Sequence, residues 1–463
     1  MNPLPTKLDQ RTYALGEYQK DVQAKLKELQ QQDFVRRFWA KDPTLWHRDP
    51  VHHKIIRNAM GWLHVIEQQV QNVSRLKALS EAVRAGGFQH LLLLGMGGSS
   101  LCPEVFRKTF GIIPGYPQLH VLDSTVPAQV KRFQKDVDLG KTLCIVSSKS
   151  GSTIEPLVFY QYFFDQMRQI KRERAGDNFI AITDPGSLLE SLAKESKFRE
   201  ILPGMPDIGG RYSALSNFGI VPAALMGVNV EHLLSRAEQM RQSCNSGVPA
   251  EGNPGVVLGV TLGELAKRGR DKITFVTSSR ISGLGAWLEQ LIAESTGKEG
   301  KGLIPIDGEA VGAPDVYGND RLFVYIRYTD EPHSVEDAKL QALERAGHPV
   351  VRVDLPDLIN LGAEFFLWEM ATAVAGSLLG INAFDQPNVQ ESKDFTKALL
   401  DEFKQTNRLA EDEPLLVSDG IGVYADAANR QALGQIDTLD KALAAHLKRI
   451  SAGDYVAVNA YVA

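Results

Sequence analysis

A hydroxyl-rich turn, Ser147-Ser148-Lys149-Ser150-Gly151-Ser152-Thr153, has the residue types of an anion-binding loop. It follows the apolar run 142–146, which predicts a buried parallel strand, and it precedes 154–160, which predicts the start of a helix. Backbone N–H groups at a helix N-terminus are unpaired, and the helix dipole adds partial positive charge there. Because the hydroxyls and the lysine would complete a phosphate cradle, we expect a small phosphorylated metabolite as the ligand.

This lysine loop differs from the loops that bind nucleotides. It lacks the Gly-x-x-x-x-Gly-Lys-Ser/Thr spacing of a P-loop, which disfavours ATP or GTP. The simpler alternative is a helix-capping loop with a solvated lysine. A second turn, 95–100, resembles a dinucleotide fingerprint, but Ser100 stands where the third glycine would be. Alone it fits a tight strand-to-helix turn equally well. With the hydroxyl-rich turn nearby, we favour a loop that contacts substrate.

Two further segments carry groups that could act on an anion. Arg211 follows Gly209 and Gly210, which would let backbone approach a ligand while the guanidinium holds its charge. The alternative is a turn with a structural arginine–carboxylate pair. In a predicted helix over 284–295, Gln290 and Glu294 share one face. A carboxylate near a helix C-terminus opposes the dipole, so a general base is one explanation, although most single glutamates are solvated surface residues.

Composition indicates an ordinary globular protein. The chain has 463 residues, of which 43% are hydrophobic and 23% charged, and its length suggests about three domains. A net charge of -5 argues against nucleic acid or an anionic membrane as partner. The stretch 365–384 is apolar, but it contains Glu369 and Asn382, so it predicts a buried helix rather than a membrane span.

The cysteines and the N-terminus indicate a cellular compartment. The cysteines are few and widely spaced, without a disulfide framework or a Cys-x-x-Cys metal site: Cys102, Cys144 and Cys244. The first residues contain no apolar signal core. We therefore expect a reducing compartment.

Strands alternate with helices along most of the chain. Residues 1 to about 85 read as helical, and buried strands are then predicted at 91–94, 119–122, 142–146, 179–182, 272–276, 322–326 and 349–353. This alternation predicts an α/β fold with two doubly wound, mainly parallel sheets, joined near 243–255. Ligands in such folds bind at the carboxyl ends of the strands, where the turns after Leu94, Val146 and Val276 lie.

We divide the chain into four parts. They are a helical N-terminal segment (1–60), a first α/β domain (61–250), a second α/β domain (251–400) and a partial C-terminal α/β segment (401–463). The last segment contains an amphipathic helix at 438–450 and a strand-like run at 455–463. An apolar strand needs a partner edge, so we expect this segment to belong to a larger or truncated domain.

In their order, these segments resemble the phosphoglucose isomerase family, which is built from two sugar-isomerase (SIS) domains. Residues 209–216 are similar to one family signature, and Phe384-Asp385-Gln386 with Lys393 resembles the second. The resemblance covers about residues 60 to 400. Within the family it is strongest to the isomerase portion of bifunctional transaldolase/glucose-6-phosphate isomerases, although the leader is too short for a transaldolase domain.

The resemblance implies interconversion of glucose 6-phosphate and fructose 6-phosphate, a step of glycolysis and gluconeogenesis. Glu294 would shuttle a proton between C2 and C1, Arg211 would stabilise the enediolate and Lys393 would assist ring opening. The substrate contacts that it implies are Gly97, Gly98, Ser99, Ser148, Lys149, Ser150, Thr153, Gln290 and Gln386. It implies no metal or redox cofactor, a hexose 6-phosphate as substrate, a homodimer and a cytoplasmic location.

Two departures from the family pattern concern ring opening. Residues 388–393 replace the usual Gly-Val-Glu-Leu-Gly-Lys and keep only the lysine, and no Asn-Gly-Gln-His occurs in 308–321. His333 and His348 lie downstream, and we interpret both as surface or turn residues. Ring opening would then depend on Lys393, on another group or on water.

Two alternatives to this activity stay open. One is an SIS isomerase for mannose 6-phosphate or an amino sugar, and the other is a non-catalytic sugar-phosphate-binding regulator. Glu294 favours an enzyme, because binding alone needs no base.

Overall fold

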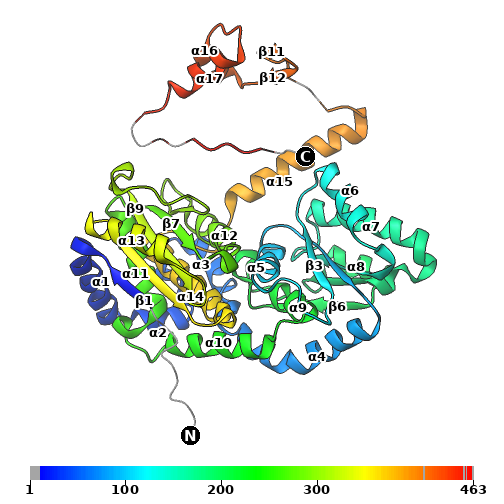
Figure 1. Ribbon diagram of the computed structural model, residues 1–463, viewed down its shortest axis with the longest axis horizontal. Coiled ribbons are helices and arrows are strands. Elements are labelled where there is room, and N and C mark those ends of the chain that lie inside the picture. The colour runs from blue at the N-terminus through cyan, green and yellow to red at the C-terminus, as the bar shows by residue number, and fades with distance from the viewer. Residues whose placement is uncertain (1–10, 410–411, 452–453, 455, 461–463) are drawn as a thin grey trace. The chain divides into compact units, whose positions relative to one another are not determined.

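The computed structural model describes residues 11–409, 412–451, 454 and 456–460, and Figure 1 shows its elements. The chain divides into two compact units, one ending at Asp385 and the other beginning at Gln386. The first unit contains two five-stranded sheets with helices around them. The prediction of two mainly parallel sheets in an α/β fold is confirmed.

The first sheet is entirely parallel, in the order β3-β2-β4-β5-β6. Its strands are β2 (His90–Leu94), β3 (Gln118–Leu122), β4 (Thr142–Ser147), β5 (Phe179–Thr183) and β6 (Glu200–Pro203). Leu94 is in register with Val146 of β4, so β2 and β4 end at the same level. The turns that follow these two strands therefore start side by side.

The second sheet has the order β1-β10-β9-β7-β8. Its strands are β1 (Arg11–Ala14), β7 (Lys272–Thr277), β8 (Ile304–Ile306), β9 (Arg321–Tyr328) and β10 (Val350–Leu355). Only β1 is antiparallel to its neighbour, β10, among these described strands. The segment predicted to be wholly helical thus contributes a strand, because its first described residues pair with the free edge of β10.

The helices of the first unit cover both sheets. They are α1 (Gln19–Gln31), α2 (Phe34–Trp39), α3 (Pro50–Arg57), α4 (Val65–Ala85), α5 (Leu101–Phe110), α6 (Pro127–Asp136), α7 (Ile154–Lys171), α8 (Leu188–Glu195), α9 (Asn217–Leu225), α10 (Val230–Ser243), α11 (Pro254–Lys267), α12 (Leu284–Thr296), α13 (Ser334–Arg345) and α14 (Leu361–Leu379). Two short 3-10 helices also matter for the site, η4 (Gly97–Ser99) and η7 (Gly210–Tyr212). Helices α5 and α12 meet between the two sheets (Figure 1).

Strand periodicity explains how the first sheet is buried on both faces. Leu91 and Leu93 belong to the large core that spans the unit, whereas Leu92 and Leu94 belong to a second cluster on the other face. All four side chains are fully buried. A continuous apolar run is what a parallel strand covered on two sides requires, because successive side chains point to opposite faces.

Helix α14 is the central helix of the unit. The range Leu358–Leu379 is long and apolar enough to cross a membrane, and no other helix among the described residues passes that test. However, 89% of its apolar window is buried inside the unit. It packs against α10, α11 and α12, so the predicted buried helix is confirmed.

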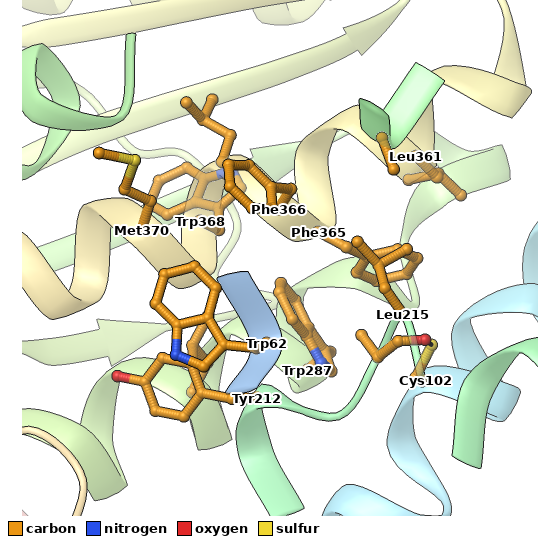
Figure 2. Packing of buried hydrophobic residues seen from close by; sticks show 14 of the residues in the cluster. Trp62, Cys102, Tyr212, Leu215, Trp287, Leu361, Phe365, Phe366, Trp368 and Met370 are labelled. Carbon is orange, nitrogen blue, oxygen red and sulfur yellow. Dashed lines mark hydrogen bonds between the residues drawn. The ribbon is translucent and has the colours of Figure 1, made fainter. Parts of the chain in front are cut away.

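Aromatic side chains fill the core beneath η7. Trp62 and Tyr212 stack with ring centroids 5.6 Å apart, and Trp62 also contacts Phe366 of α14. Figure 2 shows these rings beside Trp287 and Phe365, which pack edge to face. The residue that follows Arg211 is thus anchored in the core, which restrains the backbone at Arg211.

The second unit is smaller. It consists of α15 (Pro387–Thr406), the hairpin of β11 (Leu416–Ser418) and β12 (Ile421–Val423), α16 (Ala427–Leu433) and α17 (Leu439–Leu447). The boundary expected at residue 400 lies inside α15, and the helix predicted at 438–450 corresponds to α17. Of the strand-like run 455–463, residues 456–460 form no strand, and residues 455 and 461–463 lie outside the described residues.

Candidate active site

The hydroxyl-rich turn follows β4 and leads into α7. Lys149 Nζ donates to Asp184 Oδ2 at 2.5 Å and to the carbonyl of Pro206 at 3.3 Å. Thr153 precedes α7, and its side chain makes no capping hydrogen bond to that helix among the described residues. The first N–H groups of α7 therefore keep their capacity to bind an anion.

The hydroxyls of this turn are prepared for a polar ligand. Ser150 Oγ lies 3.4 Å from Thr153 Oγ1, so the two side chains share one side of the turn. Within the described residues, Ser148 Oγ is buried and has no hydrogen-bond partner. A buried hydroxyl without a partner is costly, and a phosphate oxygen would satisfy it.

The glycine-rich turn after β2 packs directly against η7. A Cβ atom added to Gly98 would lie 2.1 Å from the carbonyl oxygen of Gly210, a distance that no real contact allows. Ser213 Oγ donates to the same Gly210 carbonyl at 2.6 Å. Two glycine backbones thus touch where η4 and η7 meet, which places the glycine-rich turn beside Arg211.

Arg211 is fully engaged by the protein. Its guanidinium is 3% exposed and donates to Ser295 Oγ at 2.7 Å through Nε and to Glu294 Oε1 at 3.2 Å through Nη1. Nη2 donates to the carbonyls of Ala383 and Asp385, at 2.8 and 2.9 Å. These bonds come from α12 and from the segment that follows α14, so the charge is held in one position.

Helix α12 presents Gln290 and Glu294 toward this arginine. Its apolar positions, including Trp287, Leu291 and Ile292, are buried at helical spacing, which leaves the opposite face for polar residues. Gln290 Nε2 donates to Glu294 Oε2 at 3.2 Å. Among the described residues, Gln290 Oε1 is buried without a hydrogen-bond partner. Gln290 also lies against Gly97, because a Cβ there would be 2.8 Å from its Nε2.

A second cation, Lys298, lies four residues beyond Glu294. Its Nζ donates to Asp385 Oδ1 at 2.5 Å and to the carbonyls of Asn382 and Asp385, each at 2.6 Å. Burial, followed by the charge of Arg211, lowers the pKa of Lys298. On the other side of Asp385, His52 Nδ1 lies 3.4 Å from Oδ2.

A buried carboxyl group lies beneath η7. Glu369 of α14 is completely buried, and this burial raises its pKa well above the usual range. Tyr212 is also buried, which raises its pKa to about 12. Burial therefore disfavours the charged form of both groups.

The first unit brings together several of the residues expected from sequence. Gly97, Gly98, Arg211, Gln290 and Glu294 form one connected cluster. Ser99 is buried in η4, at the same turn. Ser148, Lys149, Ser150 and Thr153 lie on the turn after the neighbouring strand. Gln386 and Lys393 belong to the second unit, at the N-cap of α15 and within it, so their roles stay predictions.

The two histidines downstream of the missing motif make structural contacts. His333 Nε2 lies 2.6 Å from the carbonyl of Tyr328, and His348 Nε2 lies 3.3 Å from that of Pro314. Neither contact is to a residue of the cluster around Arg211. They remain, as expected, turn or packing residues of the second sheet.

Sequence reasoning missed four contributors to the cluster, which are Ser295, Lys298, Asp385 and His52. Lys298 lies two residues beyond the end of α12, so the helical spacing of Gln290 and Glu294 does not extend to it. Asp385 stands inside the quoted Phe384-Asp385-Gln386 motif. No local pattern marks His52 as part of the cluster, because the residues of the cluster that it contacts, Asn382 and Asp385, are more than three hundred positions away.

Comparison with known proteins agrees with this arrangement. The family model described as phosphoglucose isomerase matches residues 48–312. The glucose-6-phosphate isomerase of Thermosynechococcus vestitus is 30% identical over 440 residues, which cover 85% of this chain and 80% of that protein. That of Rubrobacter xylanophilus is 30% identical over 377 residues, covering 69% of this chain and 84% of that protein.

Solved structures share the fold. A hypothetical protein from Thermus thermophilus superposes with a TM-score of 0.69 at 24% identity, covering 84% of this chain and all of that one. A glucose-6-phosphate isomerase from Chlamydia trachomatis gives 0.65 at 20% identity, covering 85% of this chain and 89% of that one. At these identities the likeness shows a common architecture, and the chemistry must be argued from the site.

Proposed function

Because this chain belongs to the phosphoglucose isomerase family, we propose that it interconverts glucose 6-phosphate and fructose 6-phosphate, with Glu294 as the base. The curated relatives carry this activity in their names, and the chain covers most of their length. The observation that carries the proposal is the contact of Glu294 with both Arg211 and Gln290 beside the glycine-rich turn.

The reaction requires a proton to move between neighbouring carbons of the open-chain sugar. A base takes the proton from C2, the electron pair forms the C1–C2 double bond, and the aldehyde oxygen becomes negative. Return of the proton to C1 and transfer of the C2 hydroxyl proton to the negative O1 give the ketose. One carboxylate that reaches both carbons can serve both transfers, and Glu294, which contacts Arg211 and Gln290, would be that carboxylate.

Arg211 supports this chemistry through charge. The enediolate carries a negative charge that is absent from the sugar, so a fixed cation stabilises it more than the ground state. Arg211 is fixed by bonds to a hydroxyl, a carboxylate and two carbonyls. Because its neighbours already define its orientation, little reorganisation is needed when the charge develops.

The phosphate of the substrate would bind at the turn after β4. Ser148, Ser150 and Thr153 offer hydroxyls and Lys149 offers a charge, while α7 offers its N-terminus. Lys393 would assist ring opening and Gln386 would contact the sugar, as the family resemblance implies. Since the turns after β2 and β4 follow neighbouring strands, one hexose phosphate could reach from the anion site to Arg211.

We also propose a cytoplasmic homodimer. The three cysteines are all buried and lie far apart in the sequence, which fits a reducing compartment. Light scattering of the purified chain tests the assembly, with a homodimer giving twice the chain mass of 51.0 kDa and a monomer contradicting it.

The test of the activity is a coupled assay for fructose 6-phosphate with the wild type and Glu294→Gln. The amide keeps the shape of the side chain but cannot accept the proton, so turnover should fall by about 10²–10⁴-fold. Inhibition by inorganic phosphate should change little, because the anion site lies on another turn.

Glu289→Gln is the matched control, because Glu289 is an exposed carboxylate on the same helix. It should keep wild-type turnover. Wild-type kinetics in Glu294→Gln would remove Glu294 as the base. A wild type that isomerises mannose 6-phosphate or an amino sugar phosphate in preference would favour the other isomerase, and one inactive on a panel of hexose phosphates would favour the regulator.

A further inference from the structure

We propose that Lys298 is a positioning residue for the isomerisation, which holds the segment 382–385 in place and thereby fixes Arg211. This inference rests on the proposed function, since it concerns the same site. It gives a role to a buried cation that no sequence motif singled out.

All three donors of the Lys298 ammonium group are used within the protein. They bind the carbonyls of Asn382 and Asp385 and the carboxylate of Asp385, at 2.5–2.6 Å. The side chain is only 7% exposed. An ammonium group has three N–H donors, so none is left for a substrate. Lys298 therefore acts through its neighbours rather than on the sugar.

Lys298 and Arg211 bind the same short segment from different parts of the chain. The carbonyl of Asp385 accepts from both Lys298 Nζ and Arg211 Nη2. Arg211 also binds the carbonyl of Ala383, and Lys298 binds that of Asn382. Carbonyls of one segment are thus shared between two cations, so the position of one cation depends on the other.

The charges explain why this arrangement needs Asp385. Two buried cations close together repel, and burial next to Arg211 lowers the pKa of Lys298. The carboxylate of Asp385 offsets this repulsion by direct contact with Lys298. His52 contacts the other carboxylate oxygen and Asn382, and its ring lies tilted against that of His47. Removing Lys298 would leave the segment with weaker partners and let its carbonyls turn away from Arg211.

The position also matters for the family's second signature. Asp385 stands in the middle of the signature Phe384-Asp385-Gln386, so Lys298 binds a residue of that signature directly. Loss of Lys298 should therefore affect the reacting end of the sugar and leave the phosphate turn unchanged. This difference separates a positioning role from a general loss of stability.

The experiment compares Lys298→Met, Lys298→Arg and Lys301→Met in the full chain. Lys301 is the control, because it is a partly exposed lysine whose ion pair is with Glu299. Lys298→Met should lower kcat about 10–100-fold while KM for glucose 6-phosphate changes less than threefold. Lys298→Arg should recover most of this loss, and Lys301→Met should match the wild type.

Binding measurements give a second readout. The probe is 5-phospho-D-arabinonate, whose carboxylate carries a negative charge as the enediolate does. Lys298→Met should weaken its inhibition in proportion to the loss in kcat, whereas inhibition by inorganic phosphate should stay within twofold. If inhibition by 5-phospho-D-arabinonate and inhibition by inorganic phosphate weakened equally, Lys298 would have a structural role only, and the proposal would be overturned.

A double-mutant cycle keeps the proposal testable if Lys298→Met does not fold. Asp385→Asn removes the same ion pair from the other side. In a Lys298→Gln background its loss in kcat should be smaller than in the wild type, because the glutamine has already removed the charge pair. Wild-type kcat in Lys298→Met or in Asp385→Asn would refute the role of Lys298. An inactive wild type would instead refute the proposed function.

Discussion

Replacing Gly98 by alanine would place a methyl group inside the contact between η4 and η7. The added Cβ would lie 2.1 Å from the carbonyl oxygen of Gly210 and 2.3 Å from its carbonyl carbon. Real Cβ atoms stay at least 3.0 Å from such atoms, so the two backbones must separate by about 0.9 Å. The obstacle is backbone on both sides, and no side chain can rotate to relieve it.

This separation should reduce activity about a hundredfold and lower Tm by only a few degrees. Gly210 precedes Arg211, so η7 carries the guanidinium with it when it moves. A misplacement of about 1 Å at a catalytic group costs about 10²-fold in rate, equivalent to about 2.7 kcal/mol of transition-state stabilisation. Overpacking costs about 1–3 kcal/mol in folding free energy, which should lower Tm by only a few degrees.

The assay is steady-state isomerisation with glucose 6-phosphate, together with a thermal melt of each variant. Gly252→Ala is the control, because its Cβ would make only an ordinary contact, 3.9 Å from Val248. It should keep wild-type kcat/KM and Tm. A Gly98→Ala enzyme with kcat/KM within threefold of the wild type would refute the contact of η4 with η7 as the support of Arg211.

Two other predictions follow from the same unit. In initial-rate measurements, Lys149→Ala should raise KM for glucose 6-phosphate about tenfold or more and change kcat less than threefold. The reason is that the phosphate is bound equally in the ground state and the transition state. A fall in kcat at unchanged KM would contradict this prediction. Glu369→Gln should stabilise the protein relative to the wild type increasingly as pH rises from 5 to 8. Burial raises the folded-state pKa of Glu369, whereas the unfolded carboxyl ionises near 4.5, so the wild type loses up to about 1.4 kcal/mol per pH unit that the variant keeps. A difference in Tm that is independent of pH would show that Glu369 is ionised in the fold.

The strands that sequence reasoning missed lie at sheet edges. Strands β1, β6 and β8 are outer strands of their sheets, and none has the continuous apolar run of a central strand. The fourth outer strand of these sheets, β3, was predicted at 119–122. Central strands such as β2 and β4 are covered on both faces, so burial alone selects their residues. An edge strand is stabilised mainly by hydrogen bonds to one neighbour, which a local pattern does not reveal.

As with the strands, the local features of the candidate site were predictable from sequence and its long-range contacts were not. The glycine turns, the hydroxyl-rich turn and the carboxylate at a helix end are local features, and residue type and spacing identify them. Lys149 binds Asp184 and the carbonyl of Pro206. Both of these partners come from other turns, and neither was predicted. The packing of Gly98 against Gly210 was not predicted either, because the two residues are far apart in the sequence and meet only in the folded chain.

The sequence by itself determined which residues could do the chemistry, because a base, a cation and hydroxyls are properties of side chains and short segments. Only the tertiary structure decided which of them act on one another. Arg211 binds a carbonyl 172 residues away, and Lys298 binds a carboxylate 87 residues away. Such contacts arise because two parallel sheets and the central helix α14 pack into one core, and no local pattern contains that information.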